Sequence, residues 1–179
     1  DKADLVARFG GMGGRLWHLA RGEDARRVSA HAPVKGLSNE TTFQEDTDDP
    51  DILDGHVWRM AEKVSGRAKA KGVAGRVVTL KLKRANHTLI SKRLSLRQPT
   101  QSADTIYGTA RGLFESVSET GAYRLLGVGI SDLCPAEGAD AEGDLLDPQA
   151  AKRREAERAT DAIRARFGDA AIVKGRALR

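Results

Sequence analysis

The sequence has a single cysteine and no long apolar run. Cys134 cannot form an internal disulfide, and it has no CxxC or paired-histidine neighbours, so we expect a small buried hydrophobe rather than a zinc ligand. No stretch reaches the roughly 18 apolar residues of a membrane helix, and no basic leader precedes an apolar segment. The sequence therefore predicts no membrane span and no secretion signal, and a cytoplasmic setting is the expectation.

Motifs of catalysis are also missing. The histidines are scattered and accompany no serine elbow, HExxH or GxxxxGK sequence; they are His18, His31, His56 and His87. The acidic run Asp46 to Asp49 could suggest a metal site, but a turn followed by a helix cap is the simpler interpretation, since a two-metal site needs carboxylates from separate elements. The sequence predicts no catalytic residue, metal site or cofactor in this chain.

The chain lacks an initiating methionine, and it opens at Asp1 in a stretch that already has a helical pattern, so we expect a fragment of a longer protein. Its 179 residues, 40% of them hydrophobic, suffice for one ordinary core. The net charge is +5 and the isoelectric point about 9.6. An excess of Lys and Arg makes a polyanion a plausible partner, because cations that neutralise phosphates release condensed counterions.

Residues 1–22 carry an apolar stripe at helical spacing, interrupted by the glycines of Gly10 to Gly14. Two short helices around a turn are predicted. The glycines either form a tight turn or expose backbone N–H groups to a phosphate. Residues 23–33 are polar and lack periodicity, which is typical of a linker.

Residues 34–133 alternate between strand and helix patterns. Strands are predicted over 34–43, 76–84, 88–97 and 123–133 from alternating apolar and polar residues. Helices are predicted after the caps Asp49 and Ser102. The order β-α-β-β-α-β predicts an α+β fold in which two helices cover one face of a four-stranded sheet and the other face stays open.

The C-terminal part changes in composition. Residues 134–147 are rich in Ala, Gly, Asp and Glu and predict a flexible linker, and residues 148–179 predict a helix to Phe167 and a tail. The apolar stripe of this helix is thin, consisting of Ala156, Ala159, Ile163 and Phe167, so the helix should be marginal or need a partner surface.

The open sheet face should combine cations with small hydroxyls. The cations are Lys81, Lys83, Arg93 and Arg97, and the hydroxyls are Ser38, Thr42, Thr79, Ser91 and Ser95. Cations attract a sugar-phosphate chain and hydroxyls fix its register without reading bases. The alternative is an ordinary solvated sheet face.

Four passages resemble one family in the same order along the chain. They are LVARFGGMGGRLWHLARGED (5–24), VKGLSNETTFQED (34–46), GRVVTLKLK (75–83) and YRLLGVGISDL (123–133), and they resemble the Y-family translesion DNA polymerases of the bacterial DNA polymerase IV type. The resemblance implies the end of a thumb over 1–22 and a little finger, the DNA-gripping domain of that family, over 34–133. It also implies that the catalytic palm and fingers, with two Mg²⁺, precede Asp1, so that this chain alone binds primer-template DNA without synthesis.

The resemblance implies a set of contacts with the DNA backbone: Lys35, Ser38, Asn39, Thr41, Lys81, Lys83, Arg93, Arg97 and Arg124. Arg124 shares parity with the core, so it should lie at a frayed strand end if it reaches DNA. Members of the family also attach to the replicative sliding clamp through a short peptide after the last strand. Here Asp144, Leu145 and Leu146 hold that place without its glutamine and aromatic residue, so a clamp peptide and a flexible acidic linker are both open, as is a partner-recruiting domain that does not touch DNA.

Overall fold

The computed structural model describes residues 1–28, 33–117, 121–140 and 149–175. The chain divides into two compact units, Asp1–Pro33 and Val34–Arg179. Among the described residues, the helices are too short or too polar to cross a membrane. Each unit has internal contacts of its own.

The first unit is a pair of helices, α1 (Lys2–Phe9) and α2 (Gly11–Leu19). The Asp1 side chain caps α1 by accepting from the Asp4 N–H. Gly10 turns the chain at φ 57°, a left-handed conformation that favours glycine. A Cβ on Gly13 would lie 1.9 Å from the Leu5 carbonyl oxygen, so the helices pack together there. At Gly10 and Gly13 the N–H groups bond to the Val6 and Gly10 carbonyls, which agrees with the tight turn of the two interpretations.

The second unit is built on a four-stranded antiparallel sheet. Its strands are β1 (Gly36–Thr47), β2 (Val73–Arg84), β3 (Leu89–Thr100) and β4 (Tyr123–Pro135), in the spatial order β1-β4-β2-β3. The element order β-α-β-β-α-β is the predicted one. β1 runs on to Thr47, past the predicted end of this strand at residue 43, with an irregular register after Thr42.

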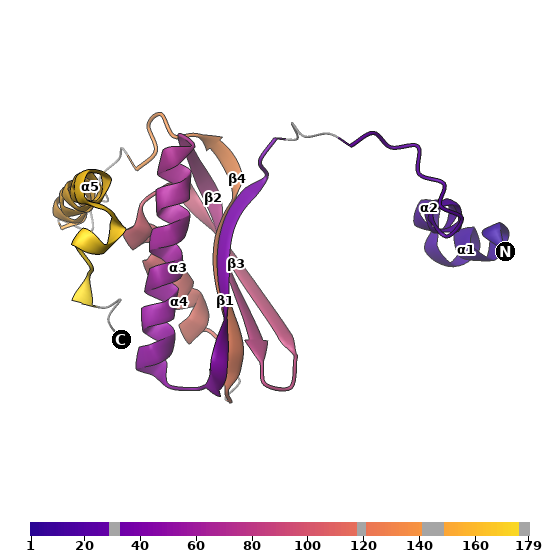
Figure 1. Cartoon of the computed structure of the whole chain (residues 1–179), viewed down its shortest axis with the longest axis horizontal. Helices are drawn as coiled ribbons and strands as arrows, with labels where there is room; N and C mark the ends of the chain where they lie inside the picture. Colours follow the sequence, from indigo (N-terminus) through magenta and orange to yellow (C-terminus); the bar gives the residue numbers. More distant parts are fainter. Residues whose placement is uncertain (29–32, 118–120, 141–148, 176–179) are drawn as a thin grey trace. The chain divides into compact units, whose positions relative to one another are not determined.

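Helices α3 (Pro50–Ala70) and α4 (Ala103–Glu115) cover one face of the sheet (Figure 1). The predicted caps are confirmed: Asp49 accepts from the Asp51 and Ile52 N–H groups, and Ser102 accepts from Thr105. The Asp49 carboxylate therefore caps a helix, as the turn-and-cap interpretation expects.

The core lies between these helices and the sheet. Both helices and the strands β1, β2 and β4 supply its buried side chains, and β3 adds the partly buried Ile90 and Leu96. The largest fully buried side chains include Trp58, Leu53, Leu80, Leu82, Ile106, Leu126 and Ile130. The Trp58 ring meets Tyr107 edge-on, with 5.2 Å between centroids. Because the apolar alternation of the strands faces the helices, their polar residues face the other side.

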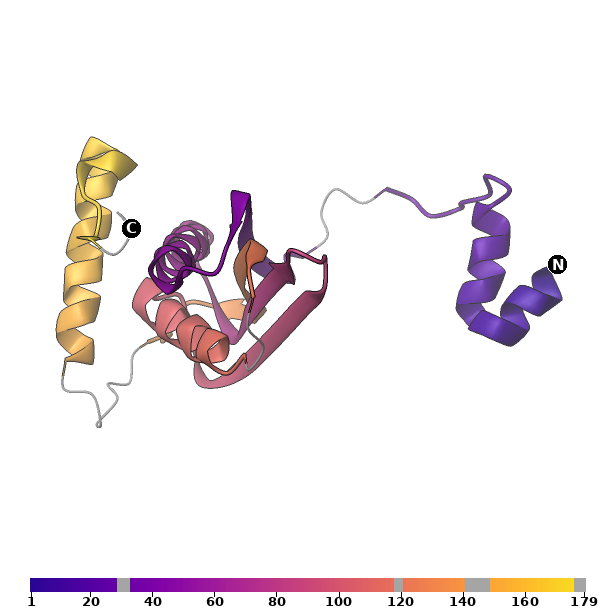
Figure 2. The same ribbon diagram turned by 90° about the horizontal axis from the view of Figure 1, so that it is seen from below.

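Helix α5 (Ala150–Phe167) lies on the side of α3 and α4 that faces away from the sheet (Figures 1 and 2). A short 3₁₀ helix, η1 (Asp169–Ala171), follows it. The expected apolar stripe does not form the contact: Phe167 is 66% and Ile163 38% exposed, whereas Glu157 is 7% exposed. The helix does have a partner surface, but it docks through polar groups.

Glu157 is the centre of that contact. Its carboxylate accepts from Ser102 Oγ at 2.8 Å, from the Ala103 N–H at 2.9 Å and from Lys69 Nζ at 2.5 Å. Burial would raise the pKa of Glu157, but Lys69 and the Ala103 N–H outweigh it and hold that pKa below its ordinary value. Burial would likewise lower the pKa of Lys69, but Asp161 and Glu157 raise it. Glu157 and Lys69 therefore form a partly buried ion pair. A second ion pair between α5 and α3, Arg164 Nη2 with Glu62 Oε1 at 3.1 Å, supports the same contact.

Candidate nucleic-acid interface

The uncovered face of the sheet consists of rows of residues that the strand register places side by side. Written in the order β1, β4, β2, β3, the rows are Gly36–Ser131–Val77–Ser95, Ser38–Gly129–Thr79–Arg93, Glu40–Gly127–Lys81–Ser91 and Thr42–Leu125–Lys83–Leu89. These sixteen residues are called the open face below. They hold three cations and one acid.

Two glycines form the middle of the open face. A Cβ on Gly127 would lie 2.8 Å from the Glu40 Cβ, and one on Gly129 would lie 2.9 Å from the Ser38 Cβ. The strands therefore approach closely there, and the β4 backbone lies bare between the side chains of β1 and β2. A hollow of about 400 Å³ lies over this part, bounded by Ser38, Glu40, Thr79 and Lys81 among others. We call the bare β4 backbone at Gly127 and Gly129 the glycine trough.

The cations of the open face lie on β2 and β3, on one side of the trough. Arg93 is exposed, and Lys81 and Lys83 are half-buried along β2. Lys81 Nζ lies 2.8 Å from Glu40 Oε2, so this ion pair spans Gly127. Within the described residues, Lys83 and Arg93 form no ion pair. With the hydroxyls of Ser38, Thr79 and Ser91 beside them, they form a surface that can hold a phosphate chain close to the sheet backbone.

Two predicted contact residues lie on the other face of β1. Asn39 and Thr41 share parity with the buried Leu37, opposite to Ser38 and Glu40. The Asn39 side chain donates to Met60 Sδ and accepts from Arg67 Nη2 at 3.3 Å, and both partners belong to α3. Asn39 and Thr41 are therefore not brought together with the open-face cations.

The other three predicted residues lie at the margins. Lys35 is exposed just before β1. Arg97 is exposed in a stretch of β3 where the register with β2 is irregular. Arg124 lies at a register irregularity near the start of β4, with Nη1 2.7 Å from the His87 Nε2 of the β2–β3 turn. Their contact with DNA stays a prediction.

The expected clamp residues Asp144, Leu145 and Leu146 lie outside the described residues. The preceding residues are tied to the sheet, since Ala136 donates to the Gly72 carbonyl and the Asp140 carboxylate accepts from Thr100 Oγ1 at 2.6 Å. The part of the linker up to Asp140 is therefore held in place. No group of three or more His, Cys, Asp or Glu residues in the described part of the chain could hold a metal ion.

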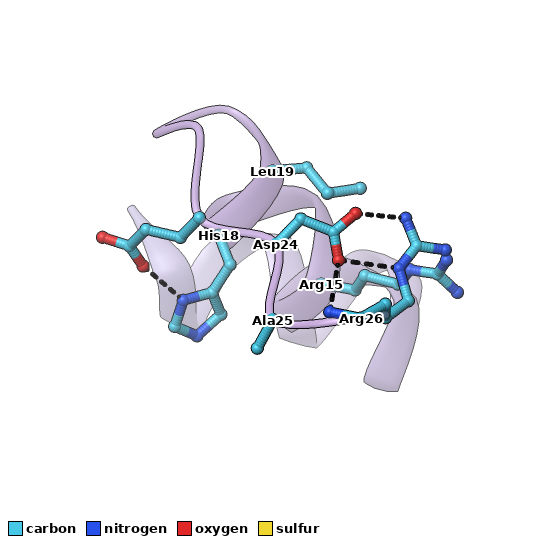
Figure 3. A pocket seen from close by; sticks show the side chains of 7 residues that line it. Arg15, His18, Leu19, Asp24, Ala25 and Arg26 are labelled. Carbon is cyan, nitrogen blue, oxygen red and sulfur yellow. Dashed lines mark hydrogen bonds and ion pairs between the residues drawn. The ribbon is translucent and has the colours of Figure 1, made fainter. Parts of the chain in front are cut away.

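The first unit has a hollow of its own, of about 720 Å³ (Figure 3). Two pairs of its lining residues interact: Arg26 binds the Asp24 carboxylate, and His18 Nδ1 lies 2.6 Å from Glu23 Oε2. On its other nitrogen, His18 lies 3.0 Å from Lys2 Nζ. These contacts hold the residues after α2 against that helix, so the structure gives them a local role.

The glycine trough and the pairing of Glu40 with Lys81 were not predicted. A signal for the trough is present, because glycines at alternate positions of a strand indicate a close backbone approach. The pairing of Glu40 with Lys81 depends on β4 lying between β1 and β2, and the alternation of one strand says nothing about its neighbours.

Comparison with known proteins gives a consistent set of matches. Residues 34–145 match the model of the impB/mucB/samB family C-terminal domain. The chain is 42% identical over 175 residues to DNA polymerase IV 1 of Mesorhizobium japonicum, a match that covers 98% of this chain and 40% of that protein. It is 39% identical to DNA polymerase IV of Caulobacter vibrioides, covering 98% of this chain and 43% of that protein. The chain thus spans about two fifths of the length of these relatives.

Among solved structures, a Y-family DNA polymerase chimera matches with a TM-score of 0.55 and 16% sequence identity, over 75% of this chain and 39% of that one. At this identity the likeness concerns the fold alone. It agrees with the predicted four-stranded α+β domain.

Proposed function

This chain belongs to the impB/mucB/samB family of Y-family DNA polymerases, of which it carries the C-terminal domain, and from that premise we propose that it binds the backbone of primer-template DNA as part of an error-prone translesion DNA polymerase, DNA polymerase IV. The open face is the surface that makes the contact. The observation that supports this most is that Lys81, Lys83 and Arg93 share one face of the sheet with the bare backbone of the glycine trough.

The chemistry of this surface fits a backbone rather than bases. Lysine and arginine contribute charge, and serine and threonine hydroxyls fix the position of phosphate oxygens, without the planar amide pairs that read adenine. A duplex held in this way is bound independently of sequence. A polymerase that moves along its template needs such binding, since each step places a new sequence on the same surface.

The catalytic step belongs to another part of the polymerase in this proposal. Two-metal phosphoryl transfer needs carboxylates from separate elements around Mg²⁺. The described residues bring no group of three or more His, Cys, Asp or Glu side chains together. We assign the Mg²⁺ and the nucleotide to the palm and fingers of a whole polymerase, and the grip on DNA to this chain.

The test is a titration of the chain with a fluorescent primer-template duplex at two salt concentrations. Lys83→Glu with Arg93→Glu should weaken binding on the order of a hundredfold at about 0.1 M salt, and should flatten the slope of log affinity against log salt by about two, since each phosphate contact contributes about 0.9. The control reverses two exposed cations on the helical side, Lys63→Glu with Lys152→Glu, and has the same net charge.

Binding that the open-face pair abolishes and the control pair retains would support the proposal. An equal loss of affinity in both double variants would show that binding depends on net charge and not on the open face. A wild-type chain that does not bind duplex at low salt would contradict it and favour recruitment of a protein partner such as the sliding clamp.

A further inference from the structure

The open face contains one acid, and that acid pairs with a cation. Glu40 and Lys81 lie on β1 and β2, in the same row, with Gly127 of β4 between them. The Glu40 carboxylate and the Lys81 ammonium reach across the glycine to 2.8 Å, and their side chains remain 50% and 40% exposed. A side chain at position 127 would separate them, so the glycine is what permits this contact.

The pair lies where a phosphate would have to lie. The hollow over the trough is bounded by both Glu40 and Lys81. A phosphate that enters this hollow is repelled by the Glu40 carboxylate. The phosphate can bind the Lys81 ammonium only by replacing Glu40 as its partner. The neighbouring cations Lys83 and Arg93 form no ion pair with a described residue, so they do not pass through this exchange.

We propose that Glu40 is an internal competitor for Lys81, which weakens the grip of the open face on DNA and speeds its release. The inference rests on the proposed function and specifies how that surface is regulated. In the free chain Glu40 takes the place of a phosphate on Lys81. In the complex Lys81 turns to the DNA, and Glu40 remains beside the backbone as an unpaired charge that favours dissociation. Such a surface lets the duplex slide, because Glu40 can replace the phosphate on Lys81 at each step along the DNA.

Glu40→Gln tests this, because it keeps the size of the side chain and removes its charge. We expect the variant to bind the primer-template duplex about three- to tenfold more tightly at about 0.1 M salt, with a salt slope steeper by up to about 0.9, the contribution of one phosphate. The dissociation rate should account for most of the change. The matched control is Glu45→Gln on the same strand, an exposed glutamate that forms no ion pair with a described residue, and it should change affinity less than twofold.

A second pair of variants isolates the ion pair from simple repulsion. In a Lys81→Met background Glu40 has no ammonium to hold, so Glu40→Gln should there yield only the part of the gain that comes from removing the repulsive charge. A smaller gain than in the wild type supports the inference. It is overturned if the gain is undiminished in the Lys81→Met background, or if Glu45→Gln matches Glu40→Gln.

The outcomes separate this inference from the proposed function. A wild-type chain that does not bind duplex DNA would contradict the proposed function itself. If the wild-type chain binds in a salt-sensitive way and Glu40→Gln leaves that affinity unchanged, only the competitor role of Glu40 is contradicted. Thermal unfolding of each variant shows that the domain is intact, and an exposed pair of this kind should shift stability little.

Discussion

Two glycines of β4 determine the shape of the open face at the scale of single residues. Gly127 and Gly129 occupy alternate positions, so both lack a side chain on the same side of the sheet. Their neighbours on β1 approach so closely that a methyl group has no room. The same two glycines therefore allow close packing of β1 against β4 and expose the β4 backbone. A substitution at either glycine should affect both the packing and the exposure.

Gly127→Ala should lower the free energy of unfolding by about 1–3 kcal/mol, because its Cβ would lie 2.8 Å from the Glu40 Cβ and the strands would have to separate. Urea denaturation measures this. Gly66→Ala in α3 is the control, since an added Cβ there meets nothing within 4 Å, and it should be neutral or stabilising by up to about 1 kcal/mol. Equal effects of the two substitutions would contradict the close packing of β1 against β4.

At the scale of elements, the docking of α5 depends on a buried carboxylate. The helix exposes Phe167 and Ile163 and buries Glu157, which binds the first turn of α4 through Ser102 and Ala103. Sequence periodicity predicts which side of a helix is apolar, and here the apolar side is not the docked side. The polar partners come from elements distant in the chain, so no local pattern could reveal them.

Glu157→Ala should destabilise the domain by about 1–3 kcal/mol, because it leaves the Ser102 hydroxyl and the Ala103 N–H at the start of α4 without their acceptor and leaves Lys69 with Asp161 alone. Urea denaturation of the variant gives the value. Glu155→Ala, on the exposed side of α5, should remain within about 0.5 kcal/mol of the wild type. A Glu157→Ala chain as stable as the control would show that α5 docks without this network.

The same network predicts a pH dependence. The pKa of Glu157 is lowered from 4.5 in the folded chain, so its contribution to stability is complete above pH 4.5 and is lost as the pH falls through the lowered folded pKa. The pKa of Lys69 is raised from 10.5, so its contribution is complete below pH 10.5 and is lost as the pH rises through the higher folded value. Stability should therefore show no step from this pair near neutral pH. The acid loss, followed by denaturation at several pH values, should be smaller in Glu157→Gln.

At the scale of the whole molecule, the chain is a small helical pair followed by a domain with its own core. The buried apolar side chains of the core all belong to residues of the second unit. In the first unit, hydrogen bonds join α1 with α2 and α2 with the residues just after it. Stability and the open face should therefore both reside in the second unit.

Residues 34–179 alone should fold and bind primer-template DNA with the salt slope of the whole chain, because the open face lies wholly within them. Circular dichroism on heating and the duplex titration measure the two properties. A truncated chain that fails to unfold cooperatively would show that the helical pair completes its core. Intact folding with a flatter salt slope would instead place part of the DNA contact in residues 1–33.

The alternation of the strands was enough to predict the fold class and most of the open face. Lys81, Lys83 and Arg93 lie on one face as predicted because side chains alternate along an extended backbone. Asn39 and Thr41 lie on the opposite face, as the parity of β1 itself indicates. The contact between Glu40 and Lys81 could not be predicted, since it depends on which strand lies between them.

The last strand of the domain is also an inner strand of its sheet, and this affects the order in which the chain can fold. β4 pairs with both β1 and β2, whereas β2 and β3 are joined by a short turn and can pair as a local hairpin. During synthesis β1 leaves the ribosome long before the strand that will hold it. Contacts between strands so distant in sequence slow folding, and unpaired strand edges invite association between chains. A nascent domain that lacks β4 therefore has a hairpin and helices but no sheet, and the strand that carries the glycine trough is the one that closes the fold.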